Sequence, residues 1–394
     1  MHRIRCVGVW PSSESIEPGH SLVMPSSFDI AIVGAGIVGA ACAAEFARVD
    51  LRVAVVERDI IGGGATAAGM GHIVVMDDSE PQFALTGYSR RLWQELRPQL
   101  PDEAEYETSG TIWVAADDYE MREVHRKHRY YAERGVSTEV LDCRALAEAE
   151  PSLRGGLAGG LYVPDDAVVY PPVVARFLIQ STPGVKLFLG SPVREILHHG
   201  VRLESGDSIL ADKVVNATGD AAPSLTPGLK VMPRKGHLVI TDRYPGFIRH
   251  QLVELGYLKS AHSDSNESVA FNVQPRRTGQ ILIGSSRQYG VSDKGIDRTI
   301  VRSMLKRAAQ YLPGIGSLSA IRCWTGFRAS TPDKLPLIGP LPDQNLYLAT
   351  GHEGLGITTS LATARLLVSH VTGRETPIDI APYLPARMME HQHA

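Results

Sequence analysis

The chain has 394 residues, of which 40 are Lys or Arg and 43 are Asp or Glu, for a formal net charge of −3 at pH 7. This balance gives no electrostatic footprint for nucleic acid or an anionic membrane, so no nucleic-acid partner is expected. The length is sufficient for two domains. The four cysteines lie far apart without a C-x-x-C pair. The sequence therefore predicts no disulfide framework, iron–sulfur cluster or other metal site.

Residues 1–25 are predicted to be a disordered extension, because they are rich in Ser, Pro and Glu and lack the apolar run of a secretory signal. Met24 is an alternative start. The apolar stretch at 30–47 approaches the length of a membrane span, but its glycines and Glu45 favour a buried strand, turn and helix instead.

The first chemical motif follows the apolar run FDIAIV at 28–33, which is typical of a buried parallel strand. Gly34, Gly36 and Gly39 then form the pattern G-x-G-x-x-G before an alanine-rich helical segment. A second strand pattern, LRVAVVE, ends at Glu57. Strand, glycines, helix, strand and acid in this order indicate a dinucleotide-binding βαβ unit.

Each position in this unit has a physical role. Gly34 permits the tight turn, Gly36 lets a pyrophosphate approach the backbone, and Gly39 lets the helix pack on the strand. The helix N-terminus offers N–H groups to the phosphates. Glu57 would accept hydrogen bonds from a ribose diol and repel a 2′-phosphate, which favours FAD or NAD over NADP. A structural βαβ unit without a ligand is the alternative. The other loop residues assigned to this site are Ala35, Ile37 and Val38.

Later segments favour FAD over NAD. RDIIGGGATAAGMGH at 58–72 is a run of small residues that suits backbone wrapped around a large flat ligand. KVVNATGD at 213–220 is a buried strand pattern ending in Thr and Gly, and the hairpin-like segment before it would carry Val193 over an adenine. A simple nicotinamide-binding fold needs none of these segments. The further cofactor residues assigned here are Arg58, Ala217, Thr218 and Gly219.

Together these motifs resemble the D-amino-acid-oxidase-like flavoproteins, in particular glycine oxidase, the catalytic subunit of hydrogen cyanide synthase and the beta subunit of D-hydroxyproline dehydrogenase. The resemblance runs from about Phe28 to the C-terminus. Its markers are VGAGIVGAACA with Glu57, TAAGM, VVNATG, RCWTGFRASTPDKLPLIGP and GHEGLGI. It implies FAD as the cofactor and a loop passing along the flavin ring. That loop comprises Thr66, Ala67, Ala68, Gly69 and Met70.

The same resemblance implies a substrate site. Arg328 matches the position that holds the substrate carboxylate, for which a planar guanidinium with two parallel hydrogen bonds is suited. An arginine paired with a surface acid is the alternative, and Arg322 serves as a control for an ordinary strand-end arginine. Aligning Gly279 and Gly284 with glycine oxidase places Asn272 where that enzyme has a substrate-facing tyrosine. The amide suits a hydroxylated ring, although it can equally bond its neighbouring strand.

The family oxidises a C–N bond beside a carboxylate, and the implied reaction passes a hydride from the neutral amine to flavin N5. Catalysis then rests on positioning by the protein and on the redox chemistry of the cofactor. His72 and His352 are candidate proton carriers, with packing or hydrogen bonding as the alternative.

The substrate we expect first is D-hydroxyproline, with glycine, sarcosine, L-proline and other D-amino acids left open. Reduced flavin can pass its electrons to oxygen, as in an oxidase, or to a partner. The resemblance to subunits of multi-component dehydrogenases favours a dehydrogenase that passes electrons to a partner, and the chain has no cysteine cluster for an iron–sulfur relay of its own. Iron–sulfur subunits, a second flavoprotein or quinone are the candidate acceptors, in a homo- or hetero-oligomer. We expect a cytoplasmic protein, or one held at the inner face of the membrane through that partner. A catalytically silent, FAD-binding electron-relay subunit is the alternative from another class.

GHEGLGITTS at 351–360 stands directly before a long apolar helical pattern. Gly351, Gly354 and Gly356 remove the side chains that would keep a flat ring away. The helix N-terminus can then face flavin N1 and the C2 carbonyl, where reduced flavin carries its negative charge. Gly373 is the expected end of the helix. The remaining residues assigned to this contact are His352, Leu355, Ile357 and Thr358.

The predicted fold is α/β, with a Rossmann-type FAD-binding domain and a discontinuous α+β substrate domain built on an antiparallel sheet. The FAD-binding domain is assigned to residues 26–75, 155–225 and 326–388. The substrate domain is assigned to residues 76–154 and 226–325, with a helical stretch at 82–150 and strands from 230 to 325.

Overall fold

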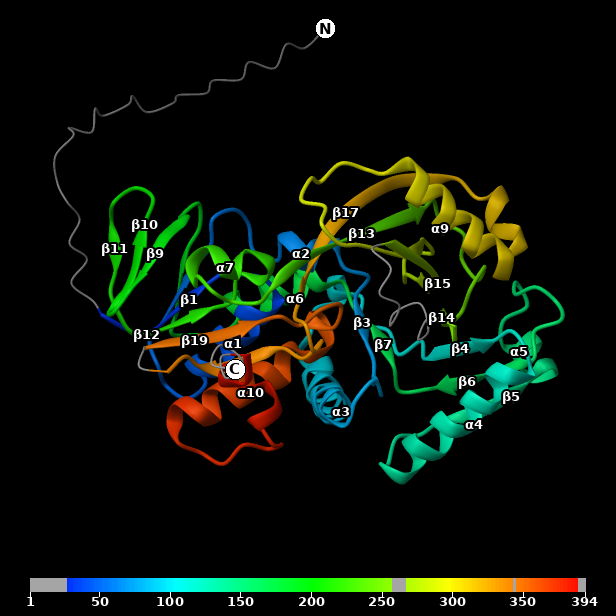
Figure 1. Ribbon diagram of the computed structural model, residues 1–394, viewed down its shortest axis with the longest axis horizontal. Coiled ribbons are helices and arrows are strands. Elements are labelled where there is room, and N and C mark those ends of the chain that lie inside the picture. The colour runs from blue at the N-terminus through cyan, green and yellow to red at the C-terminus, as the bar shows by residue number, and fades with distance from the viewer. Residues whose placement is uncertain (1–26, 257–266, 343–344, 389–394) are drawn as a thin grey trace, which may run out of the picture.

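The computed structural model describes residues 27–256, 267–342 and 345–388 (Figure 1). The extension predicted at residues 1–25 lies outside these ranges. Two large sheets organise the described chain, one with six strands and one with eight. This architecture agrees with the predicted fold class.

The six-stranded sheet has the order β18-β19-β12-β1-β2-β8 and is parallel except at β18. Its strands are apolar because helices and a second sheet cover both faces. Alternate residues of β1 point to opposite faces, so Ile30 and Ile32 join a different core from Ala31 and Val33. The strands are β1 (Phe28–Val33), β2 (Val53–Val56), β8 (Val185–Phe188), β12 (Ala211–Asn216), β18 (Leu337–Pro340) and β19 (Leu346–Thr350).

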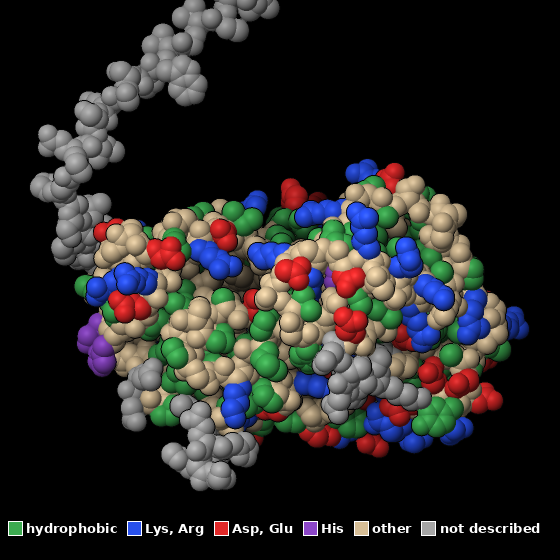
Figure 2. Space-filling view, turned by 45° about the horizontal axis from the view of Figure 1, so that its top comes forward, with side chains coloured by type: hydrophobic (Ala, Val, Ile, Leu, Met, Phe, Trp, Pro, Cys, Tyr) green, Lys and Arg blue, Asp and Glu red, His purple; other side chains and the backbone are tan. Residues whose placement is uncertain are grey.

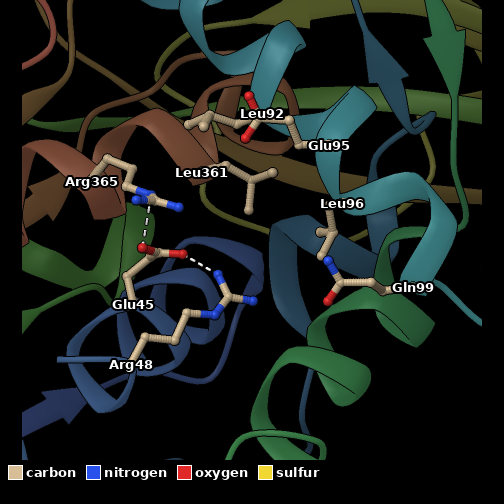
Figure 3. A pocket seen from close by; sticks show the side chains of 8 residues that line it. All are labelled: Glu45, Arg48, Leu92, Glu95, Leu96, Gln99, Leu361 and Arg365. Carbon is tan, nitrogen blue, oxygen red and sulfur yellow. Dashed lines mark hydrogen bonds and ion pairs between the residues drawn. The ribbon is translucent and has the colours of Figure 1, made fainter. Parts of the chain in front are cut away.

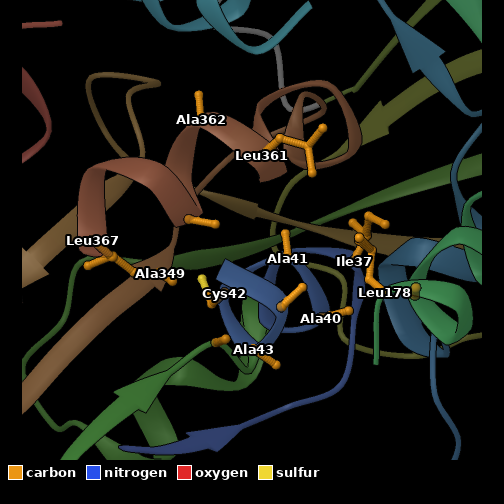
Figure 4. Close-up of a cluster of buried hydrophobic side chains, with 14 of the residues drawn as sticks. Ile37, Ala40, Ala41, Cys42, Ala43, Leu178, Ala349, Leu361, Ala362 and Leu367 are labelled. Atoms are coloured by element: carbon orange, nitrogen blue, oxygen red, sulfur yellow. The ribbon is translucent and has the colours of Figure 1, made fainter. Parts of the chain in front are cut away.

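Helices cover one face of this sheet. The alanine-rich helix α1 brings its backbone close to α10, because its inward residues are small (Figure 4). Leu361 and Leu367 of α10 and Leu178 of α6 pack beside it. The helices of this layer are α1 (Ile37–Ala47), α3 (Glu80–Leu96), α6 (Pro171–Gln180) and α10 (Gly356–Thr372).

A three-stranded antiparallel sheet covers the other face, as the hairpin-like segment predicted. It is formed by β9 (Val193–Leu197), β10 (Gly200–Leu203) and β11 (Ser208–Ile209). Helix α7 (Ala222–Leu225) follows β12.

The eight-stranded sheet has the order β17-β13-β16-β15-β14-β4-β6-β5. All of its neighbouring strands are antiparallel except β14 and β4, which are parallel. Helix α9 (Arg298–Tyr311) packs on it, with Tyr311 stacked on Phe271 at a centroid distance of 4.5 Å. The strands are β4 (Thr111–Ala115), β5 (Glu139–Asp142), β6 (Gly159–Val163), β13 (Met232–Thr241), β14 (Gln251–Glu254), β15 (Glu267–Pro275), β16 (Ile281–Gln288) and β17 (Ala320–Ser330).

The stretch at 82–150 is not wholly helical, contrary to expectation. Besides α3, it contains α4 (Asp118–Glu133) and α5 (Cys143–Ala149), and between them the strands β4 and β5. These strands pair with β6, which comes from a segment assigned to the FAD-binding domain. The apolar run TIWVA forms a strand because it is buried along its whole length in the sheet. The domain boundaries themselves stay predictions.

Strands β13 and β17 connect the two parts of the molecule (Figure 1). The short helix α2 (Gly64–Ala68) packs against β17. Strand β3 (His72–Ile73) follows α2 in the chain and pairs with β7 (Ala167–Val168). Acidic and basic side chains are intermixed on the face shown in Figure 2. In the described residues, no helix is long and apolar enough to cross a membrane, and no group of His, Cys, Asp and Glu could hold a metal ion.

Lys127 of α4 allows a test of what holds this helix against β4 and the segment that contains Asp77. Its side chain is fully buried, pairs with Asp77 and lies 4.8 Å from the centroid of the Trp113 ring. We expect Asp77→Ala to lower the free energy of unfolding by about 3 kcal/mol or more, because it leaves the Lys127 charge buried without that carboxylate. Lys127→Met should lower the free energy of unfolding by less, because the Asp77 carboxylate still has Arg126 as an ion-pair partner at 3.2 Å. Urea unfolding of both variants measures the difference; equal losses would contradict this account.

Candidate active site

The glycine loop after β1 is closed by backbone contacts that exclude side chains. Gly34 has φ +103°, and a Cβ atom there would lie 2.8 Å from the carbonyl oxygen of Ala217. A Cβ atom at Gly39 would lie 1.9 Å from the carbonyl oxygen of Gly34. Carbonyl groups of a packed strand cannot retreat from such contacts. The turn and the close helix packing therefore depend on glycine, in the manner expected for a dinucleotide loop.

The start of α1 is arranged to receive a phosphate group. Gly36 is its N-cap and no side chain caps that residue. The Ile37 N–H donates to Oγ1 of Thr66 at 3.0 Å, and Glu57 Oε2 accepts from the Ala35 N–H at 2.7 Å. Thr66 thus joins the second glycine-rich loop to the first. A helix N-terminus whose N-cap residue has no side chain, beside a fixed carboxylate, fits the diphosphate and ribose of FAD.

The segment after β12 forms another wall of this region. Asn216 Oδ1 accepts from the Thr218 N–H at 3.2 Å and from its hydroxyl at 2.7 Å. Gly219 has φ +63° and its carbonyl accepts from Thr350. Val193 of β9 is half-buried on the neighbouring core, and Arg58 is exposed. The contact of Val193 with an adenine and the cofactor role of Arg58 stay predictions.

Residues 66–70 lie between α10 and the eight-stranded sheet. A Cβ atom at Gly69 would lie 2.7 Å from Cδ1 of Ile357, and one at Gly326 would lie 2.3 Å from Cβ of Ala68. On β16, a Cβ atom at Gly284 would lie 3.3 Å from Sδ of Met70. The glycines of this loop and of the strands facing it therefore make room for side chains of the neighbouring elements, so that the three elements pack closely.

Helix α10 begins beside this loop. Leu355 is its N-cap and no side chain caps the first turn, while Gly373 ends the helix in the left-handed conformation with φ +66°, as predicted. The Thr358 hydroxyl donates to the His72 carbonyl at 2.8 Å. Gly351 has φ +77°, and a Cβ atom there would lie 2.6 Å from Cγ2 of Thr331. The positive end of the helix is therefore available to an electron-rich ligand.

Arg328 lies on the face of β17 that packs on residues 66–70. Alternate residues of a strand share a face, so Arg328 points to the side where Gly326 meets Ala68. Its Nη1 donates to the carbonyl oxygen of Ser286 on β16 at 3.1 Å. Arg322, the control, is exposed and lies over the Trp324 ring. Arg328 is half-buried, and its role in binding the substrate stays a prediction.

Asn272 of β15 is buried and lies opposite Gly284, on the side of Met70. Its Oδ1 has no hydrogen-bond partner among the described residues, so this atom does not bond the neighbouring strand. Gln274, two residues later, donates from Nε2 to the Met70 carbonyl at 2.7 Å. The sequence analysis missed Gln274, although the period of two in a strand places it on the face of Asn272.

The two predicted histidines differ in their contacts. Burial lowers the pKa of His72 to about 4 and that of His352 to about 3. His352 Nε2 lies 2.9 Å from the Thr363 hydroxyl, which agrees with a packing and hydrogen-bonding role. His72 Nε2 is buried without a hydrogen-bond partner in the described chain. Both are therefore neutral at pH 7, and a proton-carrying role stays a prediction.

A buried ion pair beside Arg328 was not predicted. Arg234 lies opposite Arg328 in the register of β13 and β17 and pairs with Glu353. Glu353 has φ +51°, and its N–H donates to the Ala329 carbonyl at 2.9 Å. The pair holds the loop before α10 on the sheet. The sequence offered one signal for this pair, because Glu353 is a charged residue between the glycines of GHEGLGI.

A separate surface cavity of about 230 Å³ lies at the other end of α1 (Figure 3). Glu45 of α1 pairs there with Arg48 and, at 2.8 Å, with Arg365 of α10. None of the predicted site residues lines this cavity. Its lining residues are Glu45, Arg48, Leu92, Glu95, Leu96, Gln99, Leu361 and Arg365.

A family model described as "FAD dependent oxidoreductase" (DAO) matches residues 29–370. The chain belongs to this DAO family of FAD-dependent oxidoreductases. Membership confirms the predicted family, the enzyme class and FAD as the cofactor. The glycine loop, the uncapped start of α1 and Glu57 are the features of the structure that fit this cofactor.

Individual relatives and a solved structure agree with this assignment. A glycine oxidase of Pseudomonas aeruginosa is 32% identical over 377 residues, covering 91% of this chain and 98% of that protein. The hydrogen cyanide synthase subunit HcnC of the same species is 28% identical over 431 residues, covering 92% and 97%. The crystal structure of glycine oxidase from Geobacillus kaustophilus has a TM-score of 0.82 and 28% identity, covering 92% of this chain and 99% of that one.

The glycine loop gives a prediction for cofactor content. We expect Gly39→Ala to lower the FAD content of the purified protein and to destabilise it by about 2 kcal/mol, because the methyl group forces α1 away from β1. Flavin absorbance per protein and urea unfolding measure both effects. Gly87→Ala is the matched control, since Gly87 lies in α3 with no heavy atom near an added Cβ. Full FAD content in Gly39→Ala would refute the packing argument.

Burial of His352 gives a prediction for pH dependence. An unfolded histidine binds a proton below about pH 6.5, whereas folded His352, with a pKa of about 3, stays neutral. The contribution of neutral His352 to the free energy of unfolding is therefore complete above about pH 6.5. As the pH decreases below that value, the contribution decreases by about 1.4 kcal/mol per pH unit. We expect His352→Gln to flatten the pH dependence of the free energy of unfolding between pH 6 and 4. The exposed His125→Gln is the control, and parallel curves for wild type and His352→Gln would contradict the prediction.

Proposed function

We propose that the chain oxidises the C–N bond beside the carboxylate of a small or cyclic amino acid, giving an imine. The observation that carries this proposal is the placement of Arg328. Its guanidinium is bonded to the Ser286 carbonyl, on the sheet face that packs against residues 66–70. A carboxylate bound there would lie beside the region assigned to the flavin ring.

The residues of this site act mainly by positioning. Arg328 would bind the substrate carboxylate through two parallel hydrogen bonds, which fix its orientation as well as its charge. When bound, FAD supplies the acceptor for the hydride that leaves the α-carbon. The nitrogen lone pair of the neutral amine forms the C=N bond, so the site needs no strong base. Burial lowers the pKa of His72 to about 4, which makes it a weak base and agrees with this requirement.

Within this reaction class we propose D-hydroxyproline as the first substrate to test. Support comes from Asn272, whose buried amide lies on the face of Met70 and can exchange hydrogen bonds with a ring hydroxyl. The similarity to glycine oxidases supports glycine or sarcosine as the alternative, and L-proline stays open.

We further propose a dehydrogenase that delivers electrons to a partner, either an iron–sulfur or flavoprotein subunit or quinone. The similarity to HcnC, a subunit of a larger enzyme, supports this reading. The four separated cysteines agree with a relay outside this chain. Attachment to such a partner at the inner membrane face is part of the same proposal.

Anaerobic absorbance spectra test the proposed reaction. We expect cis-4-hydroxy-D-proline to bleach the visible flavin bands of the purified protein, because the substrate electrons remain on the cofactor. Glycine, sarcosine, L-proline and D-alanine complete the panel and rank the alternatives. Failure of every amino acid to bleach the flavin would overturn the proposal and favour a silent relay subunit, for which a carboxylate clamp has no use.

Arg328→Lys tests the assigned clamp. Lysine keeps the charge but loses the planar fork, so we expect KM for the bleaching amino acid to rise about 10- to 100-fold with FAD content unchanged. Arg322→Lys, on the same strand but exposed, should change neither value. Loss of FAD from Arg328→Lys alone would show that Arg328 supports the cofactor rather than the substrate.

A further inference from the structure

Gly236 interrupts the side-chain pattern of β13. It lies inside the strand, directly opposite Gly326 of β17, and has no positive φ. Glycine inside a strand weakens it and often marks a site where another group approaches the backbone closely. The conformation of Gly236 therefore gives no reason for glycine, and the reason must lie in what contacts it.

The group that contacts Gly236 is the guanidinium of Arg328. A Cβ atom at Gly236 would lie 2.6 Å from Nη1, 3.0 Å from Cζ and 3.0 Å from Nη2. Three guanidinium atoms at such similar distances show that the group lies across the backbone of Gly236. A methyl group at this position would occupy the space of the guanidinium itself.

Neighbouring groups fix the guanidinium in this place. On one side Nη1 donates to the Ser286 carbonyl at 3.1 Å. On the other, the stem of Arg328 lies beside the loop before α10, where a Cβ atom at Gly354 would be 3.6 Å from Nε and 3.7 Å from Cδ. Arg234, opposite Arg328 in the register, is itself held in place by its ion pair with Glu353.

The side chain of Ser286 is itself held by a chain of hydrogen bonds. The Ser286 hydroxyl accepts from the His237 N–H at 2.9 Å and lies 3.0 Å from Nδ1 of the same residue. His237 Nε2 accepts from the Asp297 N–H at 3.1 Å, at the start of α9. This bond assigns the ring proton to Nδ1, which then donates to Ser286. Strand β16 is thereby fixed where its carbonyl meets Arg328.

We propose that Gly236 is a positioning residue that determines specificity for α-carboxylate substrates. By lacking a side chain, it provides the surface on which the guanidinium lies, and so sets the direction in which the fork faces a substrate. The proposal rests on the proposed function, in which Arg328 binds the carboxylate. It adds that the orientation of this fork is set from β13, by a residue that does not touch the substrate.

The test uses Gly236→Ala as FAD-loaded enzyme. We expect KM for the amino acid that bleaches the flavin to rise at least about tenfold, because the displaced fork loses one of two charge-assisted bonds. The same loss should weaken binding of pyrrole-2-carboxylate, a planar carboxylate without an oxidisable α-C–H, followed through the flavin spectrum. FAD content should stay at the wild-type level. Gly316→Ala, with no heavy atom near its added Cβ, is the matched control and should alter none of these values.

A double-mutant cycle separates positioning from a general structural effect. If the methyl group acts only through the guanidinium, Gly236→Ala should change KM little in an Arg328→Lys background. An unchanged KM in the single variant, or an equal rise in both backgrounds, would overturn the proposal. Should Gly236→Ala fail to accumulate as folded protein, recovery of folding in the double variant supports the contact and continued failure refutes it.

The same experiments distinguish this inference from the proposed function. If no amino acid reduces the flavin and pyrrole-2-carboxylate does not bind wild-type protein, the proposed function fails. If wild-type protein binds and oxidises its substrate, and Arg328→Lys weakens that binding while Gly236→Ala does not, only the positioning role of Gly236 fails.

Discussion

The structure depends on backbone segments that meet without side chains between them. Residues 66–70 pass between α10 and the eight-stranded sheet, where Gly69 receives the Ile357 side chain, Gly326 receives Cβ of Ala68 and Gly284 lies beside the Leu238 and Met70 side chains. The same constraint closes the loop after β1, where Gly39 meets the carbonyl of Gly34. Close backbone approach leaves helix N-termini and peptide groups near the cofactor, and these provide oriented dipoles at little cost in reorganisation.

The charged side chains near the start of α10 each make contacts with more than one neighbouring element. Arg234 and Glu353 form a buried pair that fastens the loop before α10 to β13. Arg328 lies next to this pair and is bonded to the Ser286 carbonyl. A buried charge is costly unless other groups compensate it, so the pair adds order rather than simple stability. The Arg234–Glu353 pair, with the bond from the Glu353 N–H to the Ala329 carbonyl, keeps the loop before α10 in fixed relation to β13 and β17.

Local patterns in the sequence predicted the parts that depend on local chemistry. The strand FDIAIV, the glycine turn and the end of α10 at Gly373 were all found, because each follows from a few neighbouring residues. Strands β4 and β5 were missed because short apolar runs inside a helical stretch are ambiguous in period. Gln274, Arg234 and Gly236 were missed as site residues for another reason. Their roles follow from strand register, which pairs residues far apart in sequence.

Register also explains why substrate binding and cofactor binding can be separated at only some positions. Gly354 lies beside the stem of Arg328 and also precedes the first turn of α10, so this short loop contacts the strand of the arginine and leads into the helix start. Gly236 touches Arg328 from the opposite side, on a strand that continues away from the helix start. Under the proposed function, the sheet sets the direction of the arginine, while the helix and the two glycine loops hold the cofactor. A change on β13 would then act on the binding of the acid, through Arg328, and leave the cofactor contacts in place.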